Sequence, residues 1–242
     1  MAPYTVIGTP FSTFTRTITL GLHYKGLEFI QKPTLPQSEL ALEAHPFGYL
    51  PTLLVHELNG RDVNIKLRES QAIAHFIERV APEPALVLPL VADGPTLQEK
   101  VWEFVSITAS FGMFLPREFQ PDPQSFFTGF PAIEVGVVKP RVKAIDDGRV
   151  SDEEVRAQIR DSVLQLRRFL KVAEALMEPE GYVFGERLTW ADFFLYPLLA
   201  DLRAVPEWEV VGERLVGWMN SMDNLPAVQR TAAGTLSSGA RP

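Results

Sequence analysis

The amino-acid sequence predicts an α/β N-terminal domain followed by an all-α C-terminal helical domain. Residues 1–82 alternate short runs typical of strands with runs typical of helices, whereas residues 97–230 show only helical spacing. Four prolines within residues 82–95 remove backbone donors and restrict φ, which is typical of a linker. We therefore assign residues 1–82 to the first domain, 83–96 to the linker and 97–242 to the second domain.

The first two strands of the α/β domain need a connection between them. Tyr4–Ile7 is predicted to be a short buried strand, and Leu27–Ile30 a second strand. Residues 13–25 alternate apolar and β-branched side chains, so local propensity favours a strand there as well. Parallel strands require a crossover, however, which is usually helical. We therefore predict a helix over residues 13–25 from topology.

A hairpin and a helix complete the first domain. Thr52–Val55 is predicted to be a strand, and Asn59-Gly60 tolerates the positive φ of a type I′ turn that leads back through residues 63–67. Apolar side chains at helical spacing then predict a helix over residues 69–80, namely Ala72, Ile73, Phe76, Ile77 and Val80.

The second domain is predicted from helical spacing and one capping signal. Apolar side chains share one face of residues 97–115. Ser151-x-x-Glu154 is a capping box that opens one long helix with an apolar stripe reaching Ala173. Residues 116–150 are rich in Pro and Phe and are interpreted as a long insertion, either ordered or mobile, whose path the sequence does not reveal. The tail after Thr231 is small and polar, which is typical of a frayed end.

Composition excludes several classes of protein. The chain has no cysteine, so it can hold no disulfide, thiolate metal site or cysteine nucleophile. Its formal net charge of −7 argues against nucleic acid as a partner. It shows neither a secretory signal nor an apolar run of about 20 residues, so we predict no membrane association. The lack of cysteine leaves the compartment open, and a cytoplasmic location is the simplest setting for such a chain. No metal or nucleotide motif occurs, and we predict no bound metal.

Four motifs follow one another along the chain. They are Thr9-Pro10-Phe11-Ser12-Thr13-Phe14-Thr15-Arg16, Pro46-Phe47-Gly48-Tyr49-Leu50-Pro51-Thr52-Leu53, Arg68-Glu69-Ser70-Gln71-Ala72-Ile73 and Leu188-Thr189-Trp190-Ala191-Asp192. In this order and spacing they resemble the glutathione transferase family over nearly the whole chain, and the serine pattern is most similar to the plant phi class and the related fungal class A group. The resemblance implies a thioredoxin-like first domain that binds glutathione as co-substrate, without a resident cofactor.

Ser12 is the catalytic candidate that the resemblance implies. Its hydroxyl would donate a hydrogen bond to the glutathione sulfur, and the positive end of the following helix would also favour the thiolate. Thr13 is a neighbouring alternative donor and Thr15 a remoter one. The competing interpretation is that Ser12 only caps its helix.

Two further motifs are predicted to hold glutathione. The resemblance implies a cis bond between Leu50 and Pro51, so that the Leu50 backbone pairs with the cysteinyl part of the ligand like an added strand. Glu69 would bind its α-amino group, and Ser70 with the helix N-terminus would bind its carboxylate. Without the resemblance, these residues would be an ordinary strand start and an ordinary first helical turn.

The chain departs from the phi-class pattern at two places. Pro36 and Gln37 stand where His and Lys usually contact the glycine carboxylate, and Tyr49 replaces a more usual Gln. Two ligand contacts are therefore in doubt, with Gln37 as a neutral substitute for the missing cation.

The remaining candidates concern the second substrate and the helical core. Phe11, Phe111, Met113 and Phe114 are predicted to form an apolar acceptor pocket, against the simpler interpretation of core packing. Thr189 and Asp192 are predicted to form a structural N-cap.

Three functional hypotheses follow. The first is a glutathione transferase, a homodimer as the resemblance implies, whose bound thiolate attacks hydrophobic electrophiles or a peroxide oxygen. The second is a ligandin that stores aromatic or phenolic molecules, which the missing His and Lys favour. The third is a protein interaction module, which the presence of Ser12 and Glu69-Ser70 disfavours.

Overall fold

The computed structural model describes residues 2–89, 98–110 and 128–241, and the chain divides into two compact units. Unit 1 comprises Met1–Leu88 and Met222–Pro242, and unit 2 comprises Pro89–Ser221. Residues 222–242 are predicted from sequence to belong to the helical domain. The fold groups them with the first unit, because α10 (Pro226–Arg230) packs against α1 (Thr13–Tyr24). No helix within the described ranges is long and apolar enough to cross a membrane.

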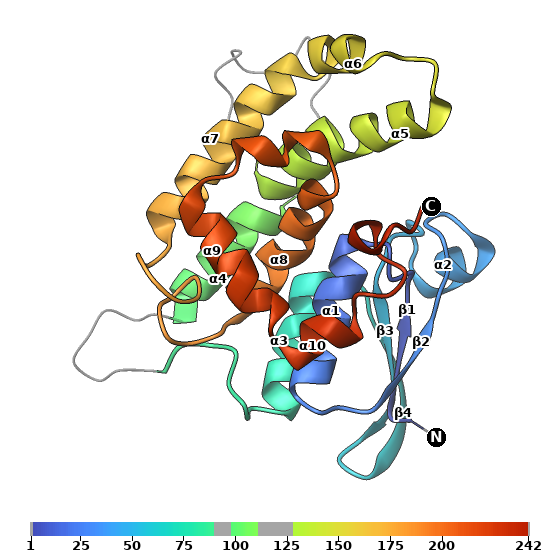
Figure 1. Ribbon diagram of the computed structural model, residues 1–242. Helices are drawn as coiled ribbons and strands as arrows, with labels where there is room; N and C mark the ends of the chain where they lie inside the picture. Colours follow the sequence, from blue (N-terminus) through green and yellow to red (C-terminus); the bar gives the residue numbers. More distant parts are fainter. Residues whose placement is uncertain (1, 90–97, 111–127, 242) are drawn as a thin grey trace, which may run out of the picture. The chain divides into compact units, whose positions relative to one another are not determined.

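Unit 1 contains a four-stranded sheet in the order β2-β1-β3-β4, with α1 and α3 (Ser70–Val80) over one of its faces (Figure 1). Its strands are β1 (Tyr4–Ile7), β2 (Phe29–Lys32), β3 (Thr52–Leu58) and β4 (Arg61–Leu67). β1 pairs with β2 in parallel and with β3 antiparallel, and β3 and β4 form the expected hairpin. Asn59 and Gly60 at its turn have φ of 53° and 73°, as a type I′ turn requires.

β2 begins two residues later than the sequence predicted. The chain leaves α1 through Gly26, whose φ is 66°, and the Leu27 N–H still donates to the Leu22 carbonyl over 2.9 Å. This bond closes the helix C-terminus, so the extended conformation starts only beyond it.

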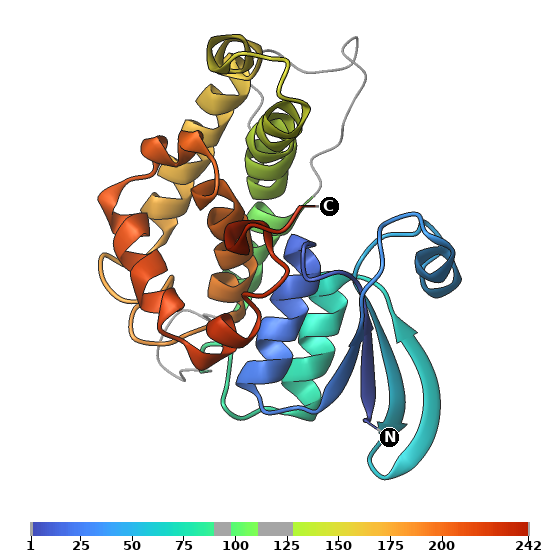
Figure 2. The same ribbon diagram turned by 45° about the vertical axis from the view of Figure 1, so that its right-hand side comes forward.

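Topology predicted α1 correctly against local propensity. Every residue from Thr13 to Leu22 is buried, because α3 (Ser70–Val80) and α10 both pack against α1. Figure 2 shows α1 and α3 side by side on one face of the sheet. The threonine hydroxyls bond inside the helix, as when Thr17 Oγ1 donates to the Thr13 carbonyl over 3.2 Å. Within α3, Ala74 is buried in place of the predicted Ala72.

A short helix, α2 (Glu39–Ala44), lies between β2 and β3, where the sequence predicted none. Ser38 caps it by accepting from the Ala41 N–H, and two side chains from the end of β4 and the residue after it bond to its carbonyls. Lys66 Nζ donates to the Glu43 carbonyl and Arg68 Nε to the Ala44 carbonyl, each over 3.0 Å. Six residues are too few to show a helical period in sequence.

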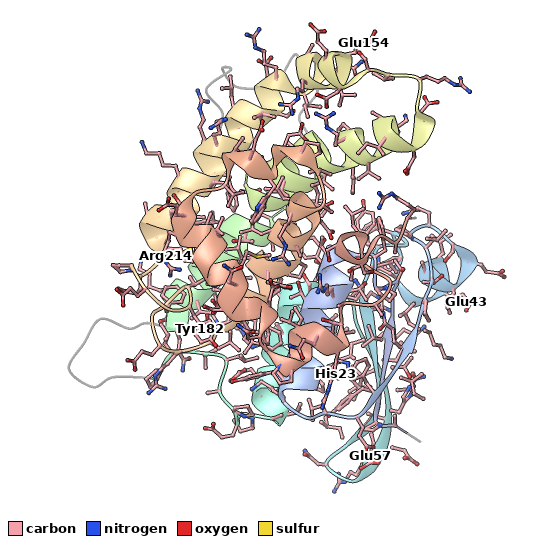
Figure 3. The ribbon with its side chains drawn as sticks, in the orientation of Figure 1. His23, Glu43, Glu57, Glu154, Tyr182 and Arg214 are labelled. Atoms are coloured by element: carbon pink, nitrogen blue, oxygen red, sulfur yellow. The ribbon has the colours of Figure 1, made fainter. Side chains whose placement is uncertain are left out.

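Helices make up unit 2, as predicted. Their bounds are α4 (Gln98–Ala109), the π-helix η2 (Pro131–Val138), α5 (Lys139–Asp147), α6 (Asp152–Gln158), α7 (Arg160–Leu176), α8 (Trp190–Arg203), η3 (Pro206–Val210) and α9 (Glu213–Asp223). α8 is buried from Trp190 to Leu202 and packs against α4 and η2. Arg214 ties α9 to the loop before α8 by donating to the Glu178 and Tyr182 carbonyls (Figure 3).

Two expectations for the helical regions need correction, and a third lies partly outside the described residues. Within the expected insertion at 116–150, η2 and α5 are regular helices, and Ile133, Val137 and Val138 are buried in the core. Residues 111–127, including the end of the helix predicted over 97–115, lie outside the described residues. The capping box at Ser151 is confirmed, but the helix it opens breaks at Ile159, whose φ and ψ are −96° and 7°.

The C-terminal tail also differs from the frayed end expected after Thr231. Thr235 and Leu236 are buried, and Leu236–Ser238 forms a short 3₁₀ turn, η4. The tail is therefore an ordered part of unit 1.

Candidate active site

The register of the sheet brings three of the predicted motifs to one end of unit 1. Ile7, the last residue of β1, pairs with Thr52, the first of β3, and Leu53 pairs with Leu67 at the end of β4. The segments that carry Ser12, Leu50-Pro51 and Glu69-Ser70 are continuous with these strand ends. His23, labelled in Figure 3, marks the opposite end of α1.

Ser12 occupies the N-cap position of α1 and is partly exposed. Its hydroxyl oxygen accepts from the Thr15 N–H over 3.4 Å, a long capping bond. The hydroxyl hydrogen has no acceptor among the described residues, so it is available to a ligand at the positive end of the helix. Capping and donation to a ligand are compatible, because one uses the oxygen lone pair and the other the O–H.

The alternative donors are less accessible than Ser12. Thr15 is fully buried, and its side chain lies so close to Gly8 that a β-carbon there would come within 2.9 Å of Thr15 Cγ2. Gly8 has a φ of 156°, so both its conformation and the missing side chain allow this approach. Thr13 is also largely buried.

The Leu50–Pro51 peptide bond is cis, as the resemblance implies. Pro51 is buried at the start of β3, and neither the N–H nor the C=O of Leu50 has a hydrogen-bond partner among the described residues. An unpaired donor and acceptor on one residue can pair with an extended ligand backbone. Tyr49 is exposed, and its ring lies 5.8 Å from that of Phe47 and 5.5 Å from that of His45.

Gln37 is hydrogen-bonded to the loop that precedes Pro51. Its backbone is left-handed, with a φ of 64°, and its N–H donates to the Gly48 carbonyl over 3.0 Å. Its side-chain amide donates to the Phe47 carbonyl over 2.5 Å. Gln37 was predicted to contact the ligand, but one donor of its side-chain amide is already bonded to the Phe47 carbonyl.

His45 is a site residue that the sequence analysis did not identify. It is buried, and its Nδ1 accepts from the Phe47 N–H over 3.0 Å, which closes the same loop. Burial lowers the pKa of His45, with Glu69 raising it and Arg68 lowering it. A lowered pKa favours the neutral imidazole that can accept at Nδ1.

Glu69 and Ser70 form an open helix N-terminus. Glu69 is the N-cap of α3, yet its side chain makes no capping bond, and its carboxylate is exposed. The first helical bond runs from the Ile73 N–H to the Glu69 carbonyl, which leaves the N–H groups of residues 70–72 without partners inside the helix. An anion and a set of amide donors thus lie side by side, which suits a ligand that carries both an ammonium and a carboxylate.

The predicted acceptor pocket can be followed only in part. Phe11 is half-buried in the loop before α1, where its N–H donates to Thr9 Oγ1 over 3.3 Å. Phe111, Met113 and Phe114 lie outside the described residues.

Asp192, predicted to form an N-cap with Thr189, is a buried carboxylate with four hydrogen bonds. It accepts from the Thr189 N–H at 2.8 Å, Thr189 Oγ1 at 3.0 Å, the Val183 N–H at 2.8 Å and Trp218 Nε1 at 2.9 Å. Burial raises the pKa of Asp192, and these hydrogen bonds offset part of that rise. The arrangement joins the start of α8 to the preceding loop and to α9. In the described ranges no cluster of three or more His, Asp or Glu could hold a metal.

Comparisons with known proteins agree with this architecture. The family model described as "Glutathione S-transferase, N-terminal domain" matches residues 6–85, and that described as "Glutathione S-transferase, C-terminal domain" matches residues 154–221. Glutathione S-transferase F7 of Arabidopsis thaliana is 24% identical over 237 residues, which cover 95% of this chain and 99% of the relative.

Two solved structures share the fold. Glutathione transferase F7 from Populus trichocarpa is 23% identical with a TM-score of 0.69, and the match covers 95% of this chain and 97% of that one. Glutathione S-transferase I bound with lactoylglutathione is 21% identical with a TM-score of 0.68, over 96% and 99% of the two chains. With both domain models matched in the expected order, the chain belongs to the glutathione S-transferase family.

Proposed function

We propose that this protein binds glutathione in unit 1 and transfers its thiolate to small hydrophobic electrophiles, with Ser12 as the serine-type catalytic residue. One observation carries the proposal. The sheet register gathers an available hydroxyl, an unpaired backbone and an open helix N-terminus at one end of the unit. Two curated relatives and the solved structures bear the transferase name, and one of those structures holds lactoylglutathione.

Each part of glutathione has a matching group in this proposal. The Leu50 N–H and C=O pair with the cysteinyl backbone, which places its sulfur near the start of α1. The Glu69 carboxylate binds the α-ammonium, and the Ser70 hydroxyl with the first amides of α3 binds the adjacent carboxylate. These contacts fix the thiol relative to Ser12 before an electrophile arrives.

The chemical step requires the thiolate. A free thiol has a pKa of about 8.5, so little thiolate exists near neutral pH. The Ser12 O–H and the α1 N-terminus stabilise the anion, and the sulfur lone pair then attacks the electrophilic carbon as its leaving group departs. Because the chain has no cysteine, the only sulfur nucleophile is the one that glutathione brings. The same thiolate could attack a peroxide oxygen.

Replacing Ser12 with Ala tests this role. We expect kcat/KM for glutathione with a chloro-dinitro-aromatic substrate to fall about 100-fold or more, as for the loss of one oxyanion-type donor. The apparent pKa of the bound thiol should move towards about 8.5, the value of a free thiol. Ser151→Ala is the matched control, because it removes a serine N-cap from α6 in the other unit. Unchanged turnover and an unchanged pH profile in the Ser12 variant would refute the assignment.

A ligandin function is the second candidate, and Gln37 is the observation that favours it. The position expected to contact the glycine carboxylate has no cation, and a donor of its amide is already bonded to Phe47. Weak glutathione binding would follow. Thermal-shift titrations with glutathione and with a plant polyphenol compare the two functions, since a ligand at 100 times its Kd adds about 2.7 kcal/mol to stability. Strong stabilisation by the polyphenol without turnover would favour storage.

The homodimer implied by the resemblance remains part of the proposal. Leu42, Phe47 and Tyr49 are 49%, 66% and 55% exposed in the single chain. A second copy of the chain packed against these three side chains would remove their apolar surface from water and so favour the dimer. Light scattering should then give twice the chain mass for the native protein, and Phe47→Ser should weaken the association. Cell fractionation tests the predicted cytoplasmic location.

A further inference from the structure

We propose that the C-terminal segment Thr231–Gly239 is a positioning element for Ser12, because it packs against the loop and the helix turn that carry this residue. The inference rests on the proposed role of Ser12. The segment lies beyond the matched family domains, the second of which ends at residue 221.

The loop before Ser12 has few bonds of its own. Gly8 is anchored at the sheet, since its N–H donates to the Lys32 carbonyl over 3.0 Å and its carbonyl accepts from Gln31 Nε2 over 2.8 Å. Among the described residues, Thr9, Pro10 and Phe11 hydrogen-bond only within the loop and to Ser12. The position of the loop therefore depends on what packs against it.

The tail supplies that packing at Pro10. A β-carbon added to Gly234 would lie 3.3 Å from Pro10 Cβ and 3.4 Å from Pro10 Cγ. The backbone of Gly234 thus lies directly against Pro10, two residues before Ser12. Figures 1 and 2 both show the C-terminal segment, drawn in dark red, beside the N-terminal end of α1.

A second contact reaches the first turn of α1. Arg16 and Thr231 are both buried, and Arg16 Nε lies 3.5 Å from Thr231 Oγ1. The Arg16 N–H donates to the Ser12 carbonyl over 2.9 Å. Arg16 therefore touches the tail with its side chain and Ser12 with its backbone.

Internal hydrogen bonds and one buried side chain hold the tail in its conformation. Thr235 Oγ1 donates to the Ala232 carbonyl over 2.6 Å, and Ser238 Oγ accepts from the Thr235 N–H over 3.2 Å. Leu236 is 3% exposed, so the turn is pinned by an apolar side chain. A segment with these internal bonds resists displacement better than a free end does.

Two glycines of the tail allow a matched experiment. Gly234 and Gly239 have φ of 76° and 87°, so replacement by Ala introduces a similar backbone strain at both. Only at Gly234 does the new methyl group meet Pro10, because a β-carbon at Gly239 has no atom within 4 Å. The pair therefore separates displacement of the loop from general strain in the tail.

We expect Gly234→Ala to lower kcat/KM of conjugation at least tenfold. It should also raise the apparent pKa of the bound thiol towards that of a free thiol, as Ser12→Ala does. Gly239→Ala should stay within twofold of the native protein at a similar melting temperature. In the Ser12→Ala background Gly234→Ala should add less than twofold, because its effect passes through Ser12. Equal activities of the two glycine variants, or full additivity with Ser12→Ala, would overturn the inference.

A second measurement does not depend on catalysis. Hydrogen exchange of residues 9–16 should be faster in Gly234→Ala than in Gly239→Ala. Thr231→Val removes the oxygen that faces Arg16, and exchange of the same residues should be faster in this variant than in the native protein. If Ser12→Ala is fully active but exchange rises as expected, the proposed function fails while the packing of the loop stands. If Ser12→Ala loses activity and exchange is equal in the glycine variants, the positioning role alone is refuted.

Discussion

Asp192 gives the sharpest test of how unit 2 is held together. Its buried carboxylate receives four hydrogen bonds, from two backbone N–H groups, one hydroxyl and one indole. Asp192→Asn keeps the size of the side chain but replaces one acceptor oxygen with an NH₂ group. The Oδ1 oxygen, which faces Val183 and Trp218, can remain an acceptor. The NH₂ group then faces the Thr189 N–H, and two donors cannot pair.

The expected loss of folding stability follows from the number of buried donors that Asp192→Asn leaves unpaired. The Thr189 hydroxyl can rotate and accept from the new amide, which leaves one buried N–H without a partner. One such group costs about 1–3 kcal/mol, and the retained bonds lose the strength of a charged acceptor. We expect a total of about 2–4 kcal/mol for Asp192→Asn and about 3–6 kcal/mol for Asp192→Ala, which leaves three N–H donors unpaired.

Thermal and urea unfolding measure the effect. For a chain of this size, 1 kcal/mol lowers the melting temperature by roughly 2–4 °C, so Asp192→Asn should lower it by roughly 4–16 °C. Hydrogen exchange should rise at the start of α8 first. Asp161→Asn on the exposed face of α7 is the matched control and should stay within about 0.5 kcal/mol. An Asp192→Asn variant as stable as this control would refute the hydrogen-bond argument.

Three further predictions follow from buried charges. Burial, together with Asp201, raises the pKa of Glu134 well above its usual value, so the folded state keeps a proton that the unfolded state loses above about pH 4.5. Stability should therefore fall as the pH rises from about 4.5 towards the raised pKa, and Glu134→Gln should flatten this part of the curve in pH-dependent urea unfolding. Arg141→Met leaves the buried carboxylate of Glu207 without its bidentate partner, which should cost about 3–5 kcal/mol in urea unfolding. Lys25→Met removes an ion pair of 2.9 Å to Glu78 and bonds to the carbonyls of Ala81 and Pro84, so hydrogen exchange at residues 85–88 should increase.

Each of these has a result that would contradict it. An unchanged pH slope in Glu134→Gln would show that the proton is not held at this carboxyl. The double variant Arg141→Met with Glu207→Leu should recover most of the stability, and a double variant as unstable as the single one would argue against the unpaired charge. Lys171→Met on exposed α7 serves as the control for Lys25→Met, and equal exchange in both would exclude a role of Lys25 in holding the chain after α3.

Helix α1 was predicted from the sequence, whereas the helix η2 was not. The sequence of α1 alternates apolar and β-branched side chains, which favours a strand locally, so only the need for a crossover between β1 and β2 predicted the helix. η2 is buried on most of its length, but no topological rule applies to a helical domain in the same way. Its Pro and Gly residues suggested an insertion, although Pro131 stands at the N-terminus of the helix, where proline is tolerated.

The site shows the same division. Ser12, Leu50-Pro51 and Glu69-Ser70 were identified from motifs, and the sheet register later placed their segments at one end of unit 1. The tail was missed because its partner Pro10 lies more than 200 positions earlier in the chain. His45 was missed because no motif marked its ring as the acceptor of the nearby Phe47 N–H. Gln37 was expected to face a ligand, whereas its side chain bonds to Phe47.

Spacing along the chain was thus enough to predict the strands and hairpin of the first domain, the capping box at Ser151 and the motifs of the family. Backbone preferences and short-range hydrogen bonds depend on residues close together in the chain, so a short stretch of sequence is enough to predict them. The fold alone decided that residues 222–242 return to unit 1 and that Gly234 lies against Pro10. These contacts join residues more than 200 positions apart, and such packing depends on the shapes of both surfaces, which no local pattern records.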